Sequence, residues 1–204
     1  MDNSIFQFKK FSVKHLESSM KVGVDGVLIG AWANCEGERI LDVGAGCGLI
    51  SLMMAQRNLK TKIIGIDIDP LSVKEAKFNF ENSEWKERLT AEKISFNDFM
   101  ENCVDRFDLI ISNPPYFNSG IKKPKSPRMI ARHQDSLSPY IILEKGIRML
   151  KPGGRISMIL PTDVFNEEIR DLIEEKYYLS RIQYVRRRKD LPPKRMLLEV
   201  INKS

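Results

Sequence analysis

The segment Asn113-Pro114-Pro115-Tyr116 places side by side three groups that could hold a ligand: a side-chain amide, a free carbonyl at Pro114 and an aromatic ring. Each proline fixes its own φ angle and favours extended geometry in the residue before it, so the segment is a stiff loop. It follows the apolar run 107–112, which is typical of a buried strand. Ligands of open α/β sheets bind at the edge where such loops lie, but a rigid turn with a capping asparagine also fits these residues.

A second candidate is the run Asp42-x-Gly44-x-Gly46-x-Gly48, between a predicted strand and a predicted helix. Glycines there let the backbone pass close to a ligand, and the helix start offers free N–H groups and a partial positive charge. The spacing differs from the Gly-x-Gly-x-x-Gly of dinucleotide sites, so no pyrophosphate is required. A smaller nucleoside with a zwitterionic tail would fit, and a purely structural glycine turn is the alternative.

Two acidic residues are expected to end neighbouring strands. Asp67 could accept hydrogen bonds from two ribose hydroxyls, since Asp69 already serves as the cap of the next helix. Asp98 could accept from an adenine amino group, with Phe99 or Ile68 against the ring. A turn role is the alternative for Asp98.

These residues need a sheet that brings several strand ends to one edge. Apolar runs predict strands at 39–43, 62–67, 91–96, 107–112 and 155–160, and helical patterns predict helices at 49–57, 70–82, 138–150 and 166–177. The last strands, about 179–186 and 196–201, are typical of an antiparallel pair. The alternation predicts an α/β fold with a mainly parallel sheet. Before it, alternating phenylalanines predict a short strand or extended arm, and Asp25 is expected to cap a short helix.

The composition is typical of one globular domain: 204 residues, 42% hydrophobic and 29% charged. No apolar run is long enough to span a bilayer and no signal peptide is evident, so we expect a cytoplasmic protein with no membrane partner. Three widely spaced cysteines fit reduced thiols, and His15 and His133 show no metal-ligand spacing, so no metal is expected.

Positive charge is concentrated in two segments of a chain whose net charge is +6. Residues 121–134 contain five basic residues and no acid, and residues 181–204 contain eight basic residues against two acids. Clustering of one sign indicates a polyanionic partner, and a solvated basic surface is the alternative.

Together, these strand-end features resemble a class I S-adenosylmethionine-dependent methyltransferase over about residues 20–165. The run 42–48 is similar to the first motif of that family, Asp67 to its ribose-binding acid and Asp98 to its adenine-contacting acid. Asn-Pro-Pro-Tyr resembles the signature of methyltransferases that act on conjugated amino groups: N6 of adenine, N4 of cytosine, N2 of guanine and the side-chain amide of glutamine. The resemblance implies S-adenosyl-L-methionine as cofactor and a Rossmann-like, mainly parallel seven-stranded sheet with a terminal antiparallel pair.

The chemistry of such amino groups explains the signature. The lone pair of the nitrogen is delocalised into the ring, which makes the nitrogen a poor nucleophile. The Asn113 side-chain oxygen and the Pro114 carbonyl can hold both N–H bonds and favour a tetrahedral nitrogen, while Tyr116 can stack on the ring. Positioning and electrostatic preorganisation then suffice, because the methylated nitrogen loses a proton readily.

A closer resemblance covers nearly the whole chain. The segments 8–11, 20–32, 131–133 and 192–199 are similar to the bacterial tRNA1(Val) adenine N6-methyltransferase family. This implies a tRNA partner, methylated at the adenosine just 3′ of the valine anticodon. It also implies one methyltransferase domain, 1–204, in which an arm and short helix, 1–34, lie beside the cofactor pocket of the core, 35–204. Chains of that family usually continue past the 197–199 strand, whereas this chain stops at Ser204.

The residues and the resemblances together give three sets of candidates. The catalytic candidates are Asn113, Pro114 and Tyr116. The cofactor-binding candidates are Lys21, Asp25, Asp42, Gly44, Gly46, Gly48, Asp67, Ile68, Asp98, Phe99 and Asn113. The RNA-binding candidates are Lys122, Lys123, Lys125, Arg128, Arg132, His133, Arg186, Arg187, Arg188, Lys194 and Arg195, of which His133 has a loop hydrogen-bonding role as its alternative.

Three other functions stay open: a protein glutamine N5-methyltransferase, a methyltransferase for ribosomal RNA or DNA, and a non-catalytic RNA-binding module with the same fold. Glutamine enzymes usually carry a helical N-terminal domain, for which there is no room before Arg39. The intact Asp67, glycine loop and Asn113 argue against a module that has lost its cofactor. We expect a monomer.

Overall fold

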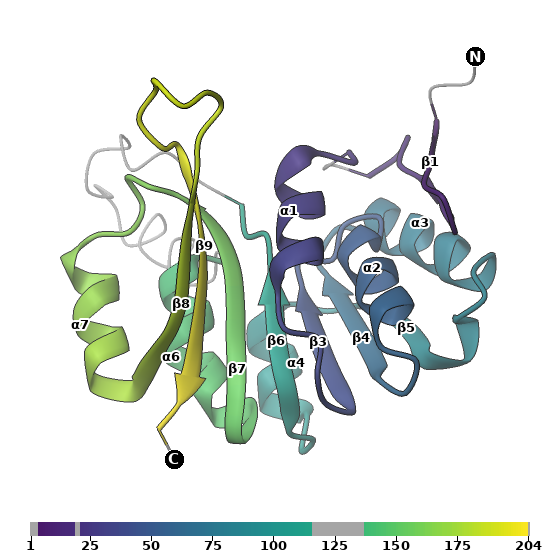
Figure 1. Cartoon of the computed structure of the whole chain (residues 1–204). Helices are drawn as coiled ribbons and strands as arrows, with labels where there is room; N and C mark the ends of the chain where they lie inside the picture. Colours follow the sequence, from purple (N-terminus) through teal and green to yellow (C-terminus); the bar gives the residue numbers. More distant parts are fainter. Residues whose placement is uncertain (1–3, 19–20, 116–136, 204) are drawn as a thin grey trace, which may run out of the picture.

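A seven-stranded sheet organises the computed structural model, which describes residues 4–18, 21–115 and 137–203 (Figure 1). Its strands are β3 (Arg39–Val43), β4 (Lys62–Asp67), β5 (Leu89–Lys93), β6 (Phe107–Ser112), β7 (Leu150–Pro161), β8 (Tyr177–Val185) and β9 (Arg195–Asn202). Their order in the sheet is β5-β4-β3-β6-β7-β9-β8. Strands β3, β4, β5, β6 and β7 are parallel to one another, and β9 runs antiparallel to both β7 and β8. The predicted α/β fold, with its terminal antiparallel pair, is confirmed.

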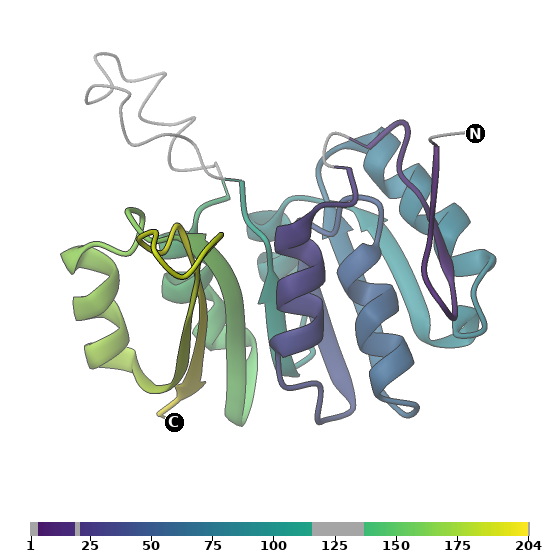
Figure 2. The ribbon, with the colours of Figure 1, turned by 45° about the horizontal axis from the view of Figure 1, so that its top comes forward.

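One layer of helices covers each face of the sheet (Figure 2). The first layer contains α1 (Val24–Trp32), α2 (Leu49–Arg57) and α3 (Pro70–Glu81), and the second contains α4 (Phe96–Asn102), α6 (Pro139–Gly146) and α7 (Glu167–Lys176). Short 3-10 turns, η1 (Lys86–Arg88) and η2 (Ile147–Met149), lead into β5 and β7. A separate hairpin of β1 (Ile5–Gln7) and β2 (Ser12–Lys14) packs on α3. No helix in the described ranges is long and apolar enough to cross a membrane.

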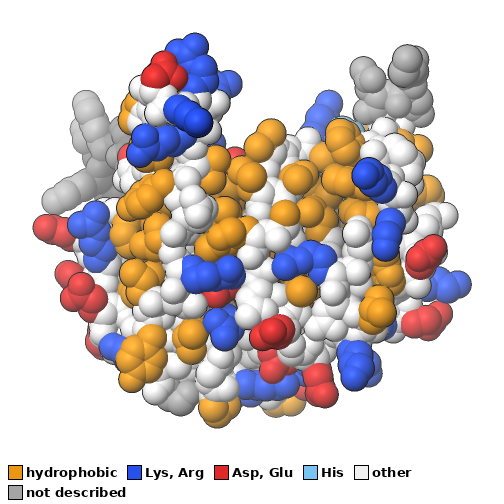
Figure 3. Space-filling view, in the orientation of Figure 1, with side chains coloured by type: hydrophobic (Ala, Val, Ile, Leu, Met, Phe, Trp, Pro, Cys, Tyr) orange, Lys and Arg blue, Asp and Glu red, His pale blue; other side chains and the backbone are white. Residues whose placement is uncertain are grey.

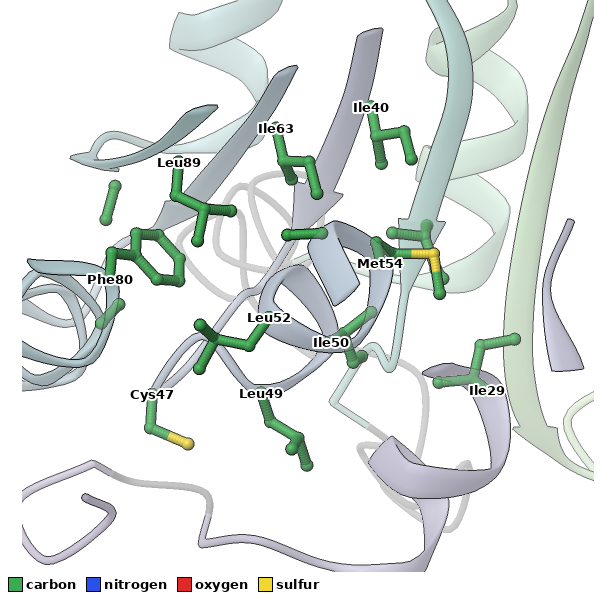
Figure 4. Packing of buried hydrophobic residues seen from close by; sticks show 14 of the residues in the cluster. Ile29, Ile40, Cys47, Leu49, Ile50, Leu52, Met54, Ile63, Phe80 and Leu89 are labelled. Carbon is green, nitrogen blue, oxygen red and sulfur yellow. The ribbon is translucent and has the colours of Figure 1, made fainter. Parts of the chain in front are cut away.

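Both faces of the central strands β3 and β6 are buried, which explains why their sequences are mostly apolar. Successive residues of β3 point to opposite layers, so Ile40 packs with α2 and its neighbours while Leu41 packs with the α6 layer. Figure 4 shows Ile40, Ile63 and Leu89, from three adjacent strands, on the side of the sheet where Leu52 of α2 packs. This packing holds the strand ends in a fixed relation to the start of α2.

Strand β9 lies between β7 and β8, and its side chains alternate between the two layers. Leu197 packs with the α1 layer, and Leu198 packs with the α6 layer. Glu199 is 1% exposed and accepts hydrogen bonds from Arg181 of β8 at 2.8 Å and from Ser157 of β7 at 3.0 Å. This buried network joins the three C-terminal strands.

The predicted third strand is misplaced. Strand β5 ends at Lys93, because Ser95 caps a new helix by accepting a hydrogen bond from the Asp98 N–H at 3.1 Å. Asp98 therefore lies in the first turn of α4 and not at a strand end.

Two further boundaries differ from prediction. Helix α1 begins at Val24 after Gly23, so Asp25 lies in the first turn and is not the cap. Strand β7 begins at Leu150, before the predicted start at 155, because the segment 151–154 continues the strand with a register shift. Gly153, with a φ of +70°, permits this irregularity.

Candidate active site

A cavity of about 700 Å³ opens at the carboxyl edge of the parallel strands, a size typical of small-molecule sites. Its walls come from the segments that follow β3, β4, β5 and β6, from the start of α1, and from the first residue of β9. The predicted cofactor and catalytic residues among them are Lys21, Asp25, Gly44, Gly46, Asp67, Ile68 and Asn113. The structure thus brings together most of the strand-end features that the sequence suggests.

The glycine loop after β3 forms the floor of the cavity. The N–H groups of Gly44 and Ala45 donate to the Ile66 carbonyl at 2.9 and 3.0 Å, which ties the loop to β4. Gly48 begins α2 with a φ of +82°, and a Cβ there would lie 2.4 Å from the Phe80 ring. Glycine is therefore required at this position for both backbone geometry and space.

Asp42 lies behind this loop rather than in the cavity wall. It is fully buried, and its Oδ2 accepts hydrogen bonds from the Ser51 N–H at 3.0 Å and the Ser51 hydroxyl at 2.7 Å. Burial raises the pKa of Asp42 to about 7, and the hydrogen bonds from Ser51 oppose the shift. Its Oδ1 has no hydrogen-bond partner within the described part of the chain. Asp42 thus anchors the start of α2 to β3.

Asp67 ends β4 and faces the cavity, as predicted from its position. Its Oδ2 accepts a hydrogen bond from the Gly46 N–H at 2.9 Å, and its Oδ1 accepts one from the Asp69 N–H at 2.9 Å. Asp69 caps α3, as expected. Ile68 is 70% exposed and lines the cavity beside this carboxylate. The Ile68 side chain offers an apolar surface for a ring.

Beside β5, the cavity is lined by Ser95, Phe96 and Asn97 in place of the expected Asp98 and Phe99. The Asp98 carboxylate is exposed and accepts a hydrogen bond from the Ser95 hydroxyl at 2.6 Å. Phe99 is buried against Phe107 in the core. The serine three residues before an acid is a helix-start signal that could have located these residues.

The Asn-Pro-Pro segment follows β6, between the ends of β3 and β7. The Ser112 hydroxyl donates to the Val43 carbonyl at 2.7 Å, which fixes the strand end beside the glycine loop. Asn113 is 9% exposed and lines the cavity with Pro115, whereas Pro114 is buried. Tyr116 lies outside the described residues.

The predicted RNA-binding residues fall into three groups. The first group, which lies outside the described residues, is Lys122, Lys123, Lys125, Arg128, Arg132 and His133. Arg186, Arg187, Arg188 and Lys194 are exposed on the β8–β9 hairpin, whose basic tip is visible at the upper left of Figure 3. Arg195 lines the cavity instead and forms an ion pair with Asp25, Nε to Oδ2, at 2.8 Å.

The residues of this cavity fit S-adenosylmethionine. Asp67 and Ile68 suit a ribose and an adenine ring, while the glycine loop and the start of α2 supply close backbone contact and positive potential. Lys21, Asp25 and Arg195 add charged side chains to the lining of the cavity. No cluster of three or more metal-ligating side chains occurs in the described ranges. Fold and site together define a class I S-adenosylmethionine-dependent methyltransferase.

Comparison with known proteins identifies the family. The model of the methyltransferase small domain matches residues 25–178. A tRNA1(Val) (adenine(37)-N6)-methyltransferase from Parabacteroides distasonis is 44% identical over 202 residues, which cover 98% of this chain and 84% of that protein. A protein of the same name from Trichodesmium erythraeum is 38% identical, with coverage of 100% and 87%. The chain belongs to the methyltransferase small domain family and, within it, to the tRNA1(Val) (adenine(37)-N6)-methyltransferases, which confirms the resemblance.

Solved structures share the fold. A 16S rRNA methyltransferase from T. thermophilus, in complex with AdoMet and guanosine, superposes with a TM-score of 0.65 at 20% identity. The match covers 98% of this chain and 50% of that one. A predicted O-methyltransferase from Agrobacterium tumefaciens gives 0.64 at 20% identity, covering 89% and 82%.

Proposed function

We propose that this protein transfers the methyl group of S-adenosylmethionine to the exocyclic N6 of an adenosine in tRNA, next to the anticodon of tRNA-Val. The names of its relatives support the substrate. The observation that carries the chemistry is Asn113, an amide held at the end of β6 in the wall of the cavity, beside the glycine loop. We further propose that the protein acts as a cytoplasmic monomer.

The role of the chain is to position the amino group. The cofactor supplies an activated methyl group when it is bound. The Asn113 side-chain oxygen and the Pro114 carbonyl each accept a hydrogen bond from one N–H group of the amino group, so that the nitrogen lone pair points into the cavity. The proline pair keeps these two acceptors rigid, and Tyr116 stacks on the base. The target adenine must leave its stack to reach this corner.

Contact with RNA is assigned to two groups of basic residues. Arg186, Arg187, Arg188 and Lys194 are exposed on the β8–β9 hairpin, next in the chain to Arg195, which lines the cavity. The cluster from Lys122 to His133 follows the catalytic segment directly in the sequence. Lysine and arginine contacts to phosphates supply most of the affinity of such surfaces.

The strongest competing function, glutamine methylation, is less well supported. The exposed arginines of the β8–β9 hairpin favour a polyanionic substrate over a protein.

The decisive experiment is methyl transfer to total tRNA, followed by mass analysis of its nucleosides. We expect N6-methyladenosine with the wild type, and a loss of about 100-fold or more in transfer rate for Asn113→Ala, because an interaction made to the reacting group is removed. Binding of tRNA should change little. Asn102→Ala, which alters an exposed asparagine on α4, should keep full activity. Methylglutamine in a release factor without N6-methyladenosine would disprove the assignment.

A further inference from the structure

The two ends of the cavity are lined by different parts of the sheet. One end is lined by residues 95–97, which follow β5, and by Asp67, which ends β4. The other end is lined by Arg195, which begins β9 on the far side of β6 and β7. Lys21 and Asp25, at the start of α1, line the same end as Arg195. The cavity therefore has a nucleoside end, beside β4 and β5, and a charged end, beside α1 and β9.

The ion pair at this end is held by regular structure. The Arg195 Nε donates to the Asp25 Oδ2 at 2.8 Å, and the two side chains are 36% and 26% exposed. Arg195 lies opposite Pro161 of β7 and Val185 of β8 in the strand register. Its side chain points towards the α1 layer, as that of Leu197 does two residues later. The guanidinium is thus fixed by the sheet.

The charges match those of an α-amino acid. A free amino-acid group carries an ammonium and a carboxylate a few ångströms apart. A guanidinium binds carboxylates through its planar set of N–H donors, and a carboxylate accepts hydrogen bonds from the N–H groups of an ammonium. An arginine and an aspartate already paired in the wall present both complements together, which lowers the cost of ordering them at binding.

We propose that Arg195 and Asp25 bind the amino-acid tail of the cofactor, with Arg195 on the carboxylate and Asp25 on the ammonium group. Clustering of charge in the sequence places Arg195 with the RNA-binding residues, but its position in the cavity wall assigns it to the cofactor. The inference rests on the cofactor of the proposed function and does not depend on its RNA substrate.

The test compares two ligands by calorimetry in the absence of tRNA. S-adenosylhomocysteine and 5′-methylthioadenosine share the nucleoside and the sulfur, but only the first has the amino-acid tail. We expect Arg195→Ala and Asp25→Asn to weaken S-adenosylhomocysteine binding at least tenfold and to change 5′-methylthioadenosine binding less than twofold. Arg195→Lys should recover part of the loss, because it keeps the charge without the fork. Arg106→Ala, an exposed arginine before β6 at the opposite edge of the sheet, is the matched control.

The outcomes separate the possibilities. Equal weakening of both ligands would show that Arg195 only supports the fold, and unchanged binding of S-adenosylhomocysteine would show that it does not touch the tail; either result overturns the proposal. If Arg195→Ala does not unfold cooperatively, the same comparison with Arg195→Lys decides. Tail-specific loss in a protein that makes no N6-methyladenosine would uphold this inference while the proposed function fails. A wild type that binds neither ligand would overturn both.

Discussion

Among single residues, the aspartates at the ends of β3 and β4 show how burial decides the role of one residue type. Asp42 is fully buried, and burial raises its pKa to about 7. Asp67, one strand away, faces the cavity and keeps both oxygens on backbone N–H groups. The first therefore serves the architecture of the loop, and the second is available to a ligand.

The pKa of Asp42 predicts a dependence of stability on pH. Its folded pKa lies above the unfolded value of 3.8. The folded protein therefore keeps a proton that the unfolded chain releases, so a stabilising contribution that is complete below about pH 4 is lost as the pH rises through about 7. Asp42→Asn lacks this proton. The unfolding free energy of the wild type relative to the variant should fall by roughly 1 kcal/mol or more between pH 5 and pH 8, because a shift of one pKa unit already has an energy of that order.

Urea unfolding at several pH values would measure this difference. Other acids titrate alike in both proteins and cancel when the two curves are subtracted. A difference that does not change with pH would mean that Asp42 ionises normally inside the fold.

Sequence patterns locate residues whose place follows from a strand end. Asp67 and Asn113 lie where predicted because an apolar run and a turn residue define each position locally. Asp98 is displaced by the competing helix cap at Ser95, a local signal of similar strength. The role of Arg195 could not be predicted, because its partner Asp25 is 170 residues away and no periodicity links them.

Among the elements, the β8–β9 hairpin has a base that packs on the sheet and a basic tip that is exposed. Its base is tied to β7 through the Thr162 hydroxyl, which donates to the Pro193 carbonyl at 3.1 Å. Its tip carries exposed Arg186, Arg187 and Arg188 beyond the sheet edge (Figure 1). Arg188 pairs only loosely with Asp190 at the surface, an interaction of little energetic value. The tip is therefore suited to phosphate contacts.

Removal of this charge should weaken tRNA binding through its salt dependence. We expect the triple substitution of Arg186, Arg187 and Arg188 by alanine to reduce the steepness of the slope of log affinity against log salt by up to about 2. Fewer phosphate contacts form in the variant, so binding releases fewer counterions. Filter binding between 50 and 200 mM salt measures the slope.

The matched control removes the same charge from the opposite edge of the sheet. Lys60 precedes β4, Lys62 is the first residue of β4, and Lys86 begins η1 before β5. All three are exposed, and their replacement by alanine should leave the slope unchanged. Equal effects of the two triple variants would mean that net charge alone, and not the hairpin, attracts RNA.

The type of most core elements was predictable, and so was the pairing of the last strands, but helix α4 was not, because the strand pattern at 91–96 hides its start. Apolar runs and capping residues such as Asp69 and Ser138 define most boundaries. The insertion of β9 between β7 and β8 could not be read from the sequence, because it depends on the buried Glu199 network and not on a local pattern.

In the whole molecule, the cavity is assembled from segments between residue 21 and residue 195. Ligand binding should therefore stabilise the fold globally. S-adenosylhomocysteine at 100 times its dissociation constant should raise the free energy of unfolding by about 2.7 kcal/mol, which calorimetric melting would detect. Binding without a shift in melting temperature would indicate that the cavity forms in only part of the molecule.

The place of β9 also has a consequence for the order of folding. Among the described strands, β8 pairs with β9 alone, although it precedes β9 in the chain. Strand β8 therefore joins the sheet only together with β9 or after it, once β9 has paired with β7. The segment that connects β7 to β9, residues 162–194, forms a long loop. Closing such a loop is slow, because chain entropy is lost before the contacts between the strands form. We therefore expect the completed cofactor cavity to form late in folding, so that binding of the amino-acid tail, through Arg195 of β9, reports that the final strands are in place.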